Sequence, residues 1–242
     1  MPVPTTPDYA PRPGVIRSFH PRRSRMSATA ADALDRLWDR RGFEIDETTP
    51  REFDRLALFG RVAPLVVEIG CGLGDATLAM AAADPARDYL GVDVHTPGLG
   101  ALLAGAEASG VTNVAAARGD GVELLRHGVT SGSLDAIHVF FPDPWPKARH
   151  HKRRIIRPGI VALMSDRLCP GGTLHTSTDW ASYADQMLAV LSADPKLRNM
   201  FDGFAPRPGG QPSGRPLTKF ESRGIAAGRT IHDCVFTRIA SA

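Results

Sequence analysis

The segment EIGCGLG at residues 68–74 combines one carboxylate with three glycines at alternate positions, Gly70, Gly72 and Gly74. Glycine has no Cβ, so such a chain can turn tightly and let its backbone approach a ligand closely. A helix that follows the loop can present free N–H groups to an anionic group. A dinucleotide-binding loop would need glycine where Asp75 stands, and a Walker loop would need GK(S/T). We therefore expect a ligand-binding loop of another class.

Three further acids follow apolar runs that have the pattern of buried strands. Asp93 lies at the end of DYLGVDV, Asp120 follows NVAAARG, and Asp143 follows LDAIHVFFP. Because the carboxyl ends of parallel strands meet at one edge of a sheet, these acids and Glu68 are expected around one cleft. Asp93 can accept from both hydroxyls of a ribose, and Asp120 from an adenine amino group. The alternative is that Glu68 is an ordinary strand residue and that Asp120 only caps a helix.

Residues 140–154 read FFPDPWPKARHHKRR: an apolar strand end, a proline-rich turn with one acid, and a run of cations. The prolines restrict the backbone on both sides of Asp143. Trp145 either stacks on a substrate ring or packs under the turn. The cations favour a phosphate partner, and the alternative is a solvated surface. The adjacent histidines His150 and His151 have no cysteine or carboxylate at ligand spacing, so no metal site is expected.

Strand and helix patterns alternate along the chain around these residues. Strands are expected over 64–70, 88–94, 113–120, 134–141 and 171–179, and helices over 28–41, 75–83, 97–108, about 153–168 and 180–193. This alternation predicts an α/β fold with a mostly parallel central sheet and helices on both faces. The strand-like tail at 229–239 is expected at the sheet edge, antiparallel to its neighbour, and the Gly/Pro-rich stretch 206–216 is expected to be a loop.

Composition is that of a soluble globular protein with a basic bias. The 242 residues carry a net charge of +3, and 43% are hydrophobic. Five arginines and one acid in the first 25 residues predict a flexible basic arm over 1–25, followed by a single domain over 26–242. The three cysteines form no CxxC pair, which is typical of a reduced cytoplasmic protein. No apolar run approaches the roughly 18 residues that a membrane span needs.

The acid-x-Gly-x-Gly-x-Gly loop is similar to motif I of S-adenosylmethionine (SAM) dependent methyltransferases, and FFPDPWPKARHHKRR closely resembles a motif of the bacterial tRNA (guanine-N7-)-methyltransferases. Four other segments resemble motifs of that family: IRSFHPRRSRM, GVDVHTPGLG, TSTDWASYADQM and TKFESRG. The resemblance implies a Rossmann-like class I SAM methyltransferase fold with an antiparallel edge strand. It also implies methyl transfer from SAM to N7 of the guanine at position 46, in the variable loop of tRNA.

The same resemblance implies roles for individual residues, with Asp143 as the catalytic residue beside the target base. The implied SAM contacts are Glu68, Gly70, Gly72, Asp93, Asp120 and Asp143. The implied substrate contacts are Lys147, Asp179, Thr218, Lys219, Phe220 and Glu221. The implied RNA contacts are Arg149, His150, His151, Lys152, Arg153 and Arg154. For Asp179 the alternative is a helix cap. The expected partner is tRNA, bound by a cytoplasmic monomer or homodimer without a metal.

Guanine N7 has a lone pair and no proton, so its methylation needs no strong general base. We expect Asp143 to stay ionised, to orient the base and to stabilise the positive charge that develops on the ring. Three other classes compete. A methyltransferase acting on a small molecule or a protein would leave the cations unused, and a non-catalytic RNA-binding module would not bind SAM. A nicotinamide dehydrogenase fits least, because the third glycine of its loop is missing.

Overall fold

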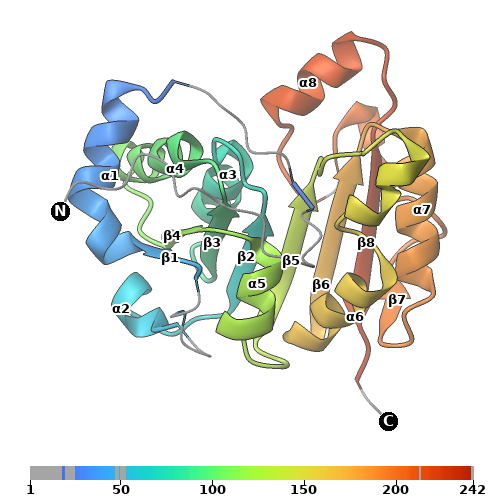
Figure 1. The fold of residues 1–242 in the computed structure, drawn as a ribbon, viewed down its shortest axis with the longest axis horizontal. Helices are drawn as coiled ribbons and strands as arrows, with labels where there is room; N and C mark the ends of the chain where they lie inside the picture. Colours follow the sequence, from blue (N-terminus) through green and yellow to red (C-terminus); the bar gives the residue numbers. More distant parts are fainter. Residues whose placement is uncertain (1–17, 20–24, 47–48, 50–52, 213, 241–242) are drawn as a thin grey trace.

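The computed structural model of the chain describes residues 18–19, 25–46, 49, 53–212 and 214–240. Most of the basic arm expected over residues 1–25 lies outside the described residues. The described residues include an eight-stranded sheet in the order β1-β4-β3-β2-β5-β6-β8-β7 (Figure 1). The strands are β1 (Gly42–Glu44), β2 (Leu65–Ile69), β3 (Asp88–Asp93), β4 (Val114–Arg118), β5 (Leu134–Phe140), β6 (Leu168–Thr178), β7 (Leu197–Asn199) and β8 (His232–Arg238).

Neighbouring strands in the part β1-β4-β3-β2-β5-β6 of the sheet are parallel. Strand β8 is antiparallel to both of its neighbours, β6 and β7. The prediction of a mostly parallel α/β sheet is confirmed, and so is the antiparallel direction of the tail strand. The tail strand β8 lies in the antiparallel edge portion of the sheet, as expected, and the three-residue β7 pairs with it on its outer side. At the opposite edge β1 pairs with β4. Strands of three residues are too short to show a sequence period, so neither β1 nor β7 was expected.

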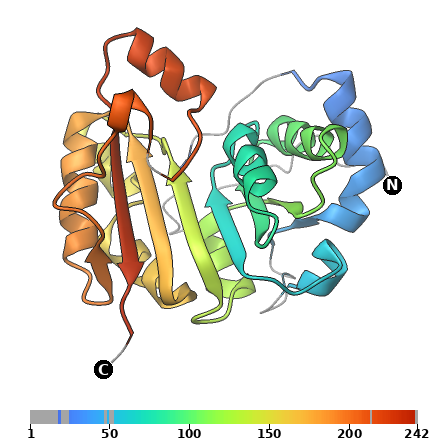
Figure 2. The same ribbon diagram turned by 180° about the vertical axis from the view of Figure 1, so that it is seen from behind.

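Helices cover both faces of the sheet. In Figure 1, α5 (Gly121–Glu123), α6 (Pro158–Arg167) and α7 (Ala181–Ser192) lie over one face, and α1 (Ala28–Arg41), α3 (Asp75–Ala83) and α4 (Thr96–Ala108) lie behind the sheet. Figure 2 shows the latter helices in front of β2 and its neighbours. The short α2 (Arg55–Phe59) and α8 (Lys219–Ala226) were not expected. The helix expected from about residue 153 begins at Pro158, after a 3₁₀ helix over Ala148–Arg153.

Apolar residues on both sides of the strands explain why the sheet is enclosed. All five residues of β2 are buried, as are all five of β4. Val67 packs in the core cluster beneath α6 and α7, whereas the adjacent Val66 packs in a second cluster with residues of α1, α3 and α4. Successive strand residues point to opposite faces, so a continuous apolar run serves both layers.

The sheet reverses its chain order between β2 and β5. From β2 the chain builds β3 and β4 on one side, and then returns to add β5 and β6 on the other. This is the doubly wound arrangement, in which ligands bind outside the carboxyl ends of the strands at the point of reversal. That edge carries the glycine loop after β2 and the turn after β5.

Candidate active site

A cleft lies at the carboxyl ends of β2, β3, β4 and β5 and brings together most of the residues expected to contact a cofactor. Gly70, Gly72, Asp93, Asp120 and Asp143 line it. Its apolar lining includes Ile69, Val92, Val139, Phe140 and Ile155. Ser18 and Phe19, from the N-terminal segment, also line the cleft.

The glycine loop has the backbone conformation that its sequence predicts. Gly70, Gly72 and Gly74 have φ angles of 80°, 60° and 79°, in the left-handed region that other residues rarely adopt. A Cβ on Gly70 or Gly72 would meet no atom within 4 Å, so the space above the loop is open. On the other side the loop packs tightly, because a Cβ on Gly98 would lie 1.9 Å from the Gly72 carbonyl oxygen. The loop is therefore fixed against α4 and open towards the cleft.

Asp93 and Asp120 each combine a structural contact with a place in the cleft lining. The Asp93 carboxylate accepts from the Gly72 N–H at 2.8 Å and from the His95 N–H at 2.9 Å. Asp120 accepts from the Val122 N–H at 2.8 Å and caps α5, and its burial raises the pKa of its carboxyl. Each carboxylate has about four lone-pair sites, so capping leaves acceptor capacity for a ligand. The helix-cap alternative for Asp120 and its place in the cleft are thus compatible.

Glu68 lies outside the residues that line the cleft. Its side chain is buried on β2 and accepts a 2.5 Å hydrogen bond from the Thr77 hydroxyl of α3. Burial raises the pKa of the Glu68 carboxyl to about 7, against the opposing effect of the Thr77 bond. The structure therefore places Glu68 beneath the glycine loop, where it joins β2 to α3, and its expected contact with SAM stays a prediction.

The turn that carries Asp143 is held in an unusual backbone conformation. Phe141 and Trp145 have positive φ angles of 51° and 45°, rare for residues other than glycine. The Trp145 side chain is buried, and its ring lies 4.8 Å from the Arg153 guanidinium carbon. Of the two alternatives for Trp145, the structure shows packing under the turn, and the half-buried Asp143 lines the cleft.

Arg154 does not share the exposed surface on which it was expected to meet RNA. It is 2% exposed, and its Nε donates to the Pro144 carbonyl at 2.8 Å. The guanidinium also donates to Gln186 and lies 4.5 Å from the centre of the Tyr183 ring. The side chain thus turns inwards and supports the Asp143 turn, and its expected contact with RNA stays a prediction.

The other cations of this segment lie at the surface. Lys147, Arg149 and Lys152 are exposed, whereas His150, His151 and Arg153 are half-buried. Arg149 Nε lies 3.4 Å from His150 Nε2. In the described part of the chain no group of three or more histidine, cysteine or carboxylate side chains could hold a metal. A basic surface therefore adjoins the cleft directly after Asp143.

The expected substrate residues from the C-terminal part of the chain, Asp179 and residues 218–221, lie on or beside α8. This helix lies above the same edge of the sheet (Figure 1). The exposed Phe220 ring lies 5.1 Å from the Phe141 ring, which lines the cleft. Asp179, at the end of β6, forms a 2.8 Å ion pair with Arg229. The Trp180 N–H at the start of α7 bonds to Thr178, so Asp179 is not the helix cap that the alternative required. Lys219 lies in α8, and its side chain is outside the described residues.

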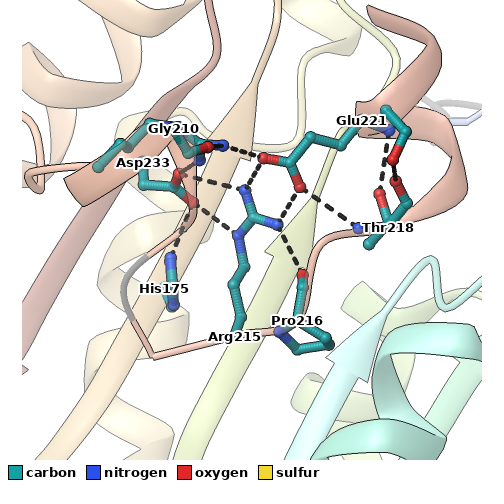
Figure 3. Close-up of polar contacts among 9 residues, drawn as sticks. His175, Gly210, Arg215, Pro216, Thr218, Glu221 and Asp233 are labelled. Atoms are coloured by element: carbon teal, nitrogen blue, oxygen red, sulfur yellow. Dashed lines mark hydrogen bonds and ion pairs between the residues drawn. The ribbon is translucent and has the colours of Figure 1, made fainter. Parts of the chain in front are cut away.

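Thr218 and Glu221 take part in structural contacts at the start of α8 and are not among the residues that line the cleft. They form a capping box at the start of α8, with the Glu221 N–H 3.1 Å from the Thr218 hydroxyl. The Glu221 carboxylate is fully buried and pairs with Arg215 (Figure 3). It also pairs with Arg207. Their expected substrate contacts stay predictions. Arg215 and Asp233 were missed, because they stand in a Gly/Pro-rich loop and a strand-like tail that share no motif spacing with α8.

Comparison of the fold identifies its class. The 16S rRNA methyltransferase KamB superposes with a TM-score of 0.58 over 78% of this chain and 95% of its own, at 16% identity. The antibiotic-resistance methyltransferase Kmr gives a TM-score of 0.50 over 74% of this chain and 89% of its own, also at 16% identity. The fold is that of the class I SAM-dependent methyltransferases.

Sequence comparison identifies the family. Residues 62–234 match the family described as putative methyltransferase. The tRNA (guanine-N(7)-)-methyltransferases of Streptomyces avermitilis and Halorhodospira halophila are 50% and 47% identical to this chain, each over 93% of it, and are covered over 76% and 96% of their own lengths. The protein belongs to the tRNA (guanine-N7-)-methyltransferase family. None of the helices in the described ranges is long and apolar enough to cross a membrane.

Proposed function

We propose that this protein transfers a methyl group from SAM to N7 of a guanine in tRNA, and that its target is guanine 46 of the variable loop. One observation carries the proposal. A single edge of the sheet joins a glycine- and acid-lined cleft to the turn of Asp143 and then to the exposed cations Lys147, Arg149 and Lys152. A cofactor site and a phosphate-binding surface thus meet at one carboxylate. The names of the relatives support the tRNA substrate.

The residues of the cleft fit the chemical groups of SAM. The open space above Gly70 and Gly72 admits a ligand against the backbone, which a Cβ at either position would narrow. Asp93 retains lone pairs for the ribose hydroxyls, and Asp120 for the adenine amino group. Apolar side chains such as Val92 and Val139 can pack against the adenine ring. When bound there, SAM supplies an electrophilic methyl group.

Asp143 orients the target base and stabilises its charge. Guanine N7 has no proton to remove, so a general base at this position would contribute little. As an acceptor, the Asp143 carboxylate receives hydrogen bonds from the guanine N1–H and exocyclic amino group, and its negative charge stabilises the methylated ring cation. Its turn is fixed by the buried Trp145 and by the bond from Arg154 to Pro144. Because the turn is rigid, little free energy is needed to reorient the carboxylate during the reaction.

The surface beside the turn holds the rest of the tRNA. Lys147, Arg149 and Lys152 present charge to backbone phosphates, which position the RNA without reading its sequence. Phe220 of α8 packs beside Phe141 of the cleft lining, and Asp179 follows β6 and pairs with Arg229. We propose that they contact the target nucleotide, and that the reaction takes place in the cytoplasm. A small-molecule substrate would leave the exposed cations without a role.

The decisive experiment is methylation of a tRNA transcript in the presence of labelled SAM. N7-methylguanine is then located by borohydride–aniline cleavage of the product. We expect one cleavage, at guanine 46, and none in a matched transcript with adenine at that position. Labelling without cleavage at any guanine, or cleavage outside the variable loop, would overturn the proposed substrate or position. The absence of SAM binding by calorimetry would overturn the enzyme class.

A further inference from the structure

Arg215 is the centre of a buried ion cluster that no motif of the sequence indicates. Its side chain is fully buried, and its guanidinium lies between the carboxylates of Asp233 and Glu221 (Figure 3). Nε donates to Asp233 at 2.7 Å, and the two terminal nitrogens donate to Glu221 at 2.6 and 3.1 Å. Further bonds reach Asp233 at 3.1 Å and the Pro216 carbonyl at 3.2 Å. All five N–H donors of the guanidinium are thus used.

The partners of Arg215 come from three separate parts of the fold. Asp233 lies on β8, and Glu221 lies in the first turn of α8. The guanidinium carbon also lies 5.2 Å from the centre of the Phe140 ring and 5.4 Å from that of Phe141, at the end of β5. One side chain therefore connects the sheet, the helix that carries the late substrate motif, and the residues that lead into the Asp143 turn.

The Asp233 end of this cluster is anchored in the sheet. Asp233 pairs with Ser177 of β6 in the strand register and accepts from His175 at 3.0 Å. Since the Asp233 carboxylate can only accept, His175 Nε2 carries the proton of that bond. Arg207 donates to Asp233 at 2.5 Å and also to Glu221. The cluster holds two carboxylates and two arginines, so its charges balance without solvent.

We infer that Arg215 is a positioning residue of the methyl-transfer site: it fixes α8 relative to the Asp143 turn, so that both halves of the substrate site face one cleft. This inference rests on the proposed function. The rings of Phe220 on α8 and Phe141 before the Asp143 turn are 5.1 Å apart, as this placement of α8 requires. The role requires arginine. Lysine keeps the charge but has three donors on one nitrogen, which cannot hold two carboxylates in bidentate pairs.

The test compares R215K with R167K, a matched control. Arg167 is also largely buried, and it donates to Leu125, Ser131 and Asp166 directly before β6, at the opposite edge of the sheet from the cleft. For each variant we would measure the thermal midpoint, the dissociation constant for SAM, kcat and KM with tRNA, and amide hydrogen exchange. For R215K we expect SAM affinity within about 3-fold of wild type and a kcat reduced by about 100-fold, the effect of a misplacement near 1 Å.

Hydrogen exchange separates positioning from general destabilisation. In R215K, the amides of α8 are expected to lose protection while those of β2 keep it. R167K is expected to keep wild-type kcat and wild-type exchange in α8, even where its midpoint falls. A kcat of R215K within 2-fold of R167K, or equal loss of protection in α8 and β2, would refute the inference.

A second variant covers the case in which R215K does not fold. D233N keeps the shape and removes one charge from the sheet end of the cluster, and it is expected to show the same loss of kcat and of α8 protection to a smaller degree. A folded D233N with wild-type kcat and α8 exchange would refute the inference. Failure of the proposed function is distinct, because it would appear as a wild-type protein that methylates no guanine N7 in tRNA.

Discussion

Glu68 provides a test of how the buried side of the glycine loop is built. Its carboxyl is fully buried between β2 and α3, where its hydrogen-bond partner is the Thr77 hydroxyl. Removal from water penalises the charged form and raises the pKa of this carboxyl from 4.5 to about 7, with a smaller contribution from the nearby charge of Asp93. The titration of Glu68 should therefore make its own contribution to the pH dependence of the free energy of unfolding.

The direction and size of that dependence follow from the two pKa values. The folded protein keeps the Glu68 proton between pH 4.5 and about 7, where the unfolded chain has released it. The contribution of Glu68 to the free energy of unfolding is fully present below pH 4.5, is lost as the pH rises through this window, and levels off above about 7. At ~1.36 kcal/mol per pH unit, the loss is on the order of 3 kcal/mol.

The Glu68→Gln variant removes this titration and keeps the shape and an acceptor for Thr77. Urea denaturation followed by circular dichroism would give the free energy of unfolding of both proteins from pH 4.5 to 8. We expect the stability of the variant relative to wild type to increase by about 3 kcal/mol across this range. Asp202→Asn, at an exposed position, is the control and should follow wild type. Parallel curves for wild type and Glu68→Gln would refute the buried, protonated carboxyl.

Three further predictions concern the cleft and the basic surface. Asp143→Asn should lower kcat by about 100-fold or more, with the SAM dissociation constant changed by less than about 3-fold; a variant with wild-type turnover would contradict the role of the charge. The double variant Arg149→Ala, Lys152→Ala should raise KM for tRNA and reduce the slope of log KM against log salt concentration by up to about 2. The control Arg198→Ala, at an exposed site on β7, should leave that slope unchanged. Gly72→Ala, at a φ of 60°, should destabilise the protein by about 1–2 kcal/mol and weaken SAM binding. Gly159→Ala is the control: this glycine lies in α6 with open space around it, so alanine should raise the thermal midpoint.

The sequence predicted the sheet and the positions of the cleft acids, because those depend on local patterns. Apolar runs long enough to form strands are buried on both sides, and the residues that follow them must lie at one edge of a parallel sheet. The side-chain direction of Glu68 was harder to predict. In a strand that is apolar on both faces, no alternation of polar and apolar residues shows which face a given residue occupies.

The residues that sequence reasoning misplaced depend on contacts between distant segments. Arg154 is one cation within a continuous basic run, and only the later Tyr183 and Gln186 of α7 distinguish it from its exposed neighbours. Arg215 stands in a loop whose composition predicts no structure, and its partner Asp233 lies 18 residues further on. In both cases a long-range partner decides whether the charge faces solvent or the interior.

These two arginines explain how a strained turn can carry the carboxylate that we propose as catalytic. Positive φ angles at Phe141 and Trp145 are each unfavourable by about 1–3 kcal/mol and persist only where the surroundings determine them. Arg154 holds the turn from α7 through the Pro144 carbonyl, and Arg215 holds the ring of Phe141 from the cluster with α8. Asp143 is thus fixed from both ends of its turn by charges that do not reach the substrate. We therefore propose that the cations around the site have two separate tasks: the exposed ones bind the RNA, and the buried ones orient Asp143.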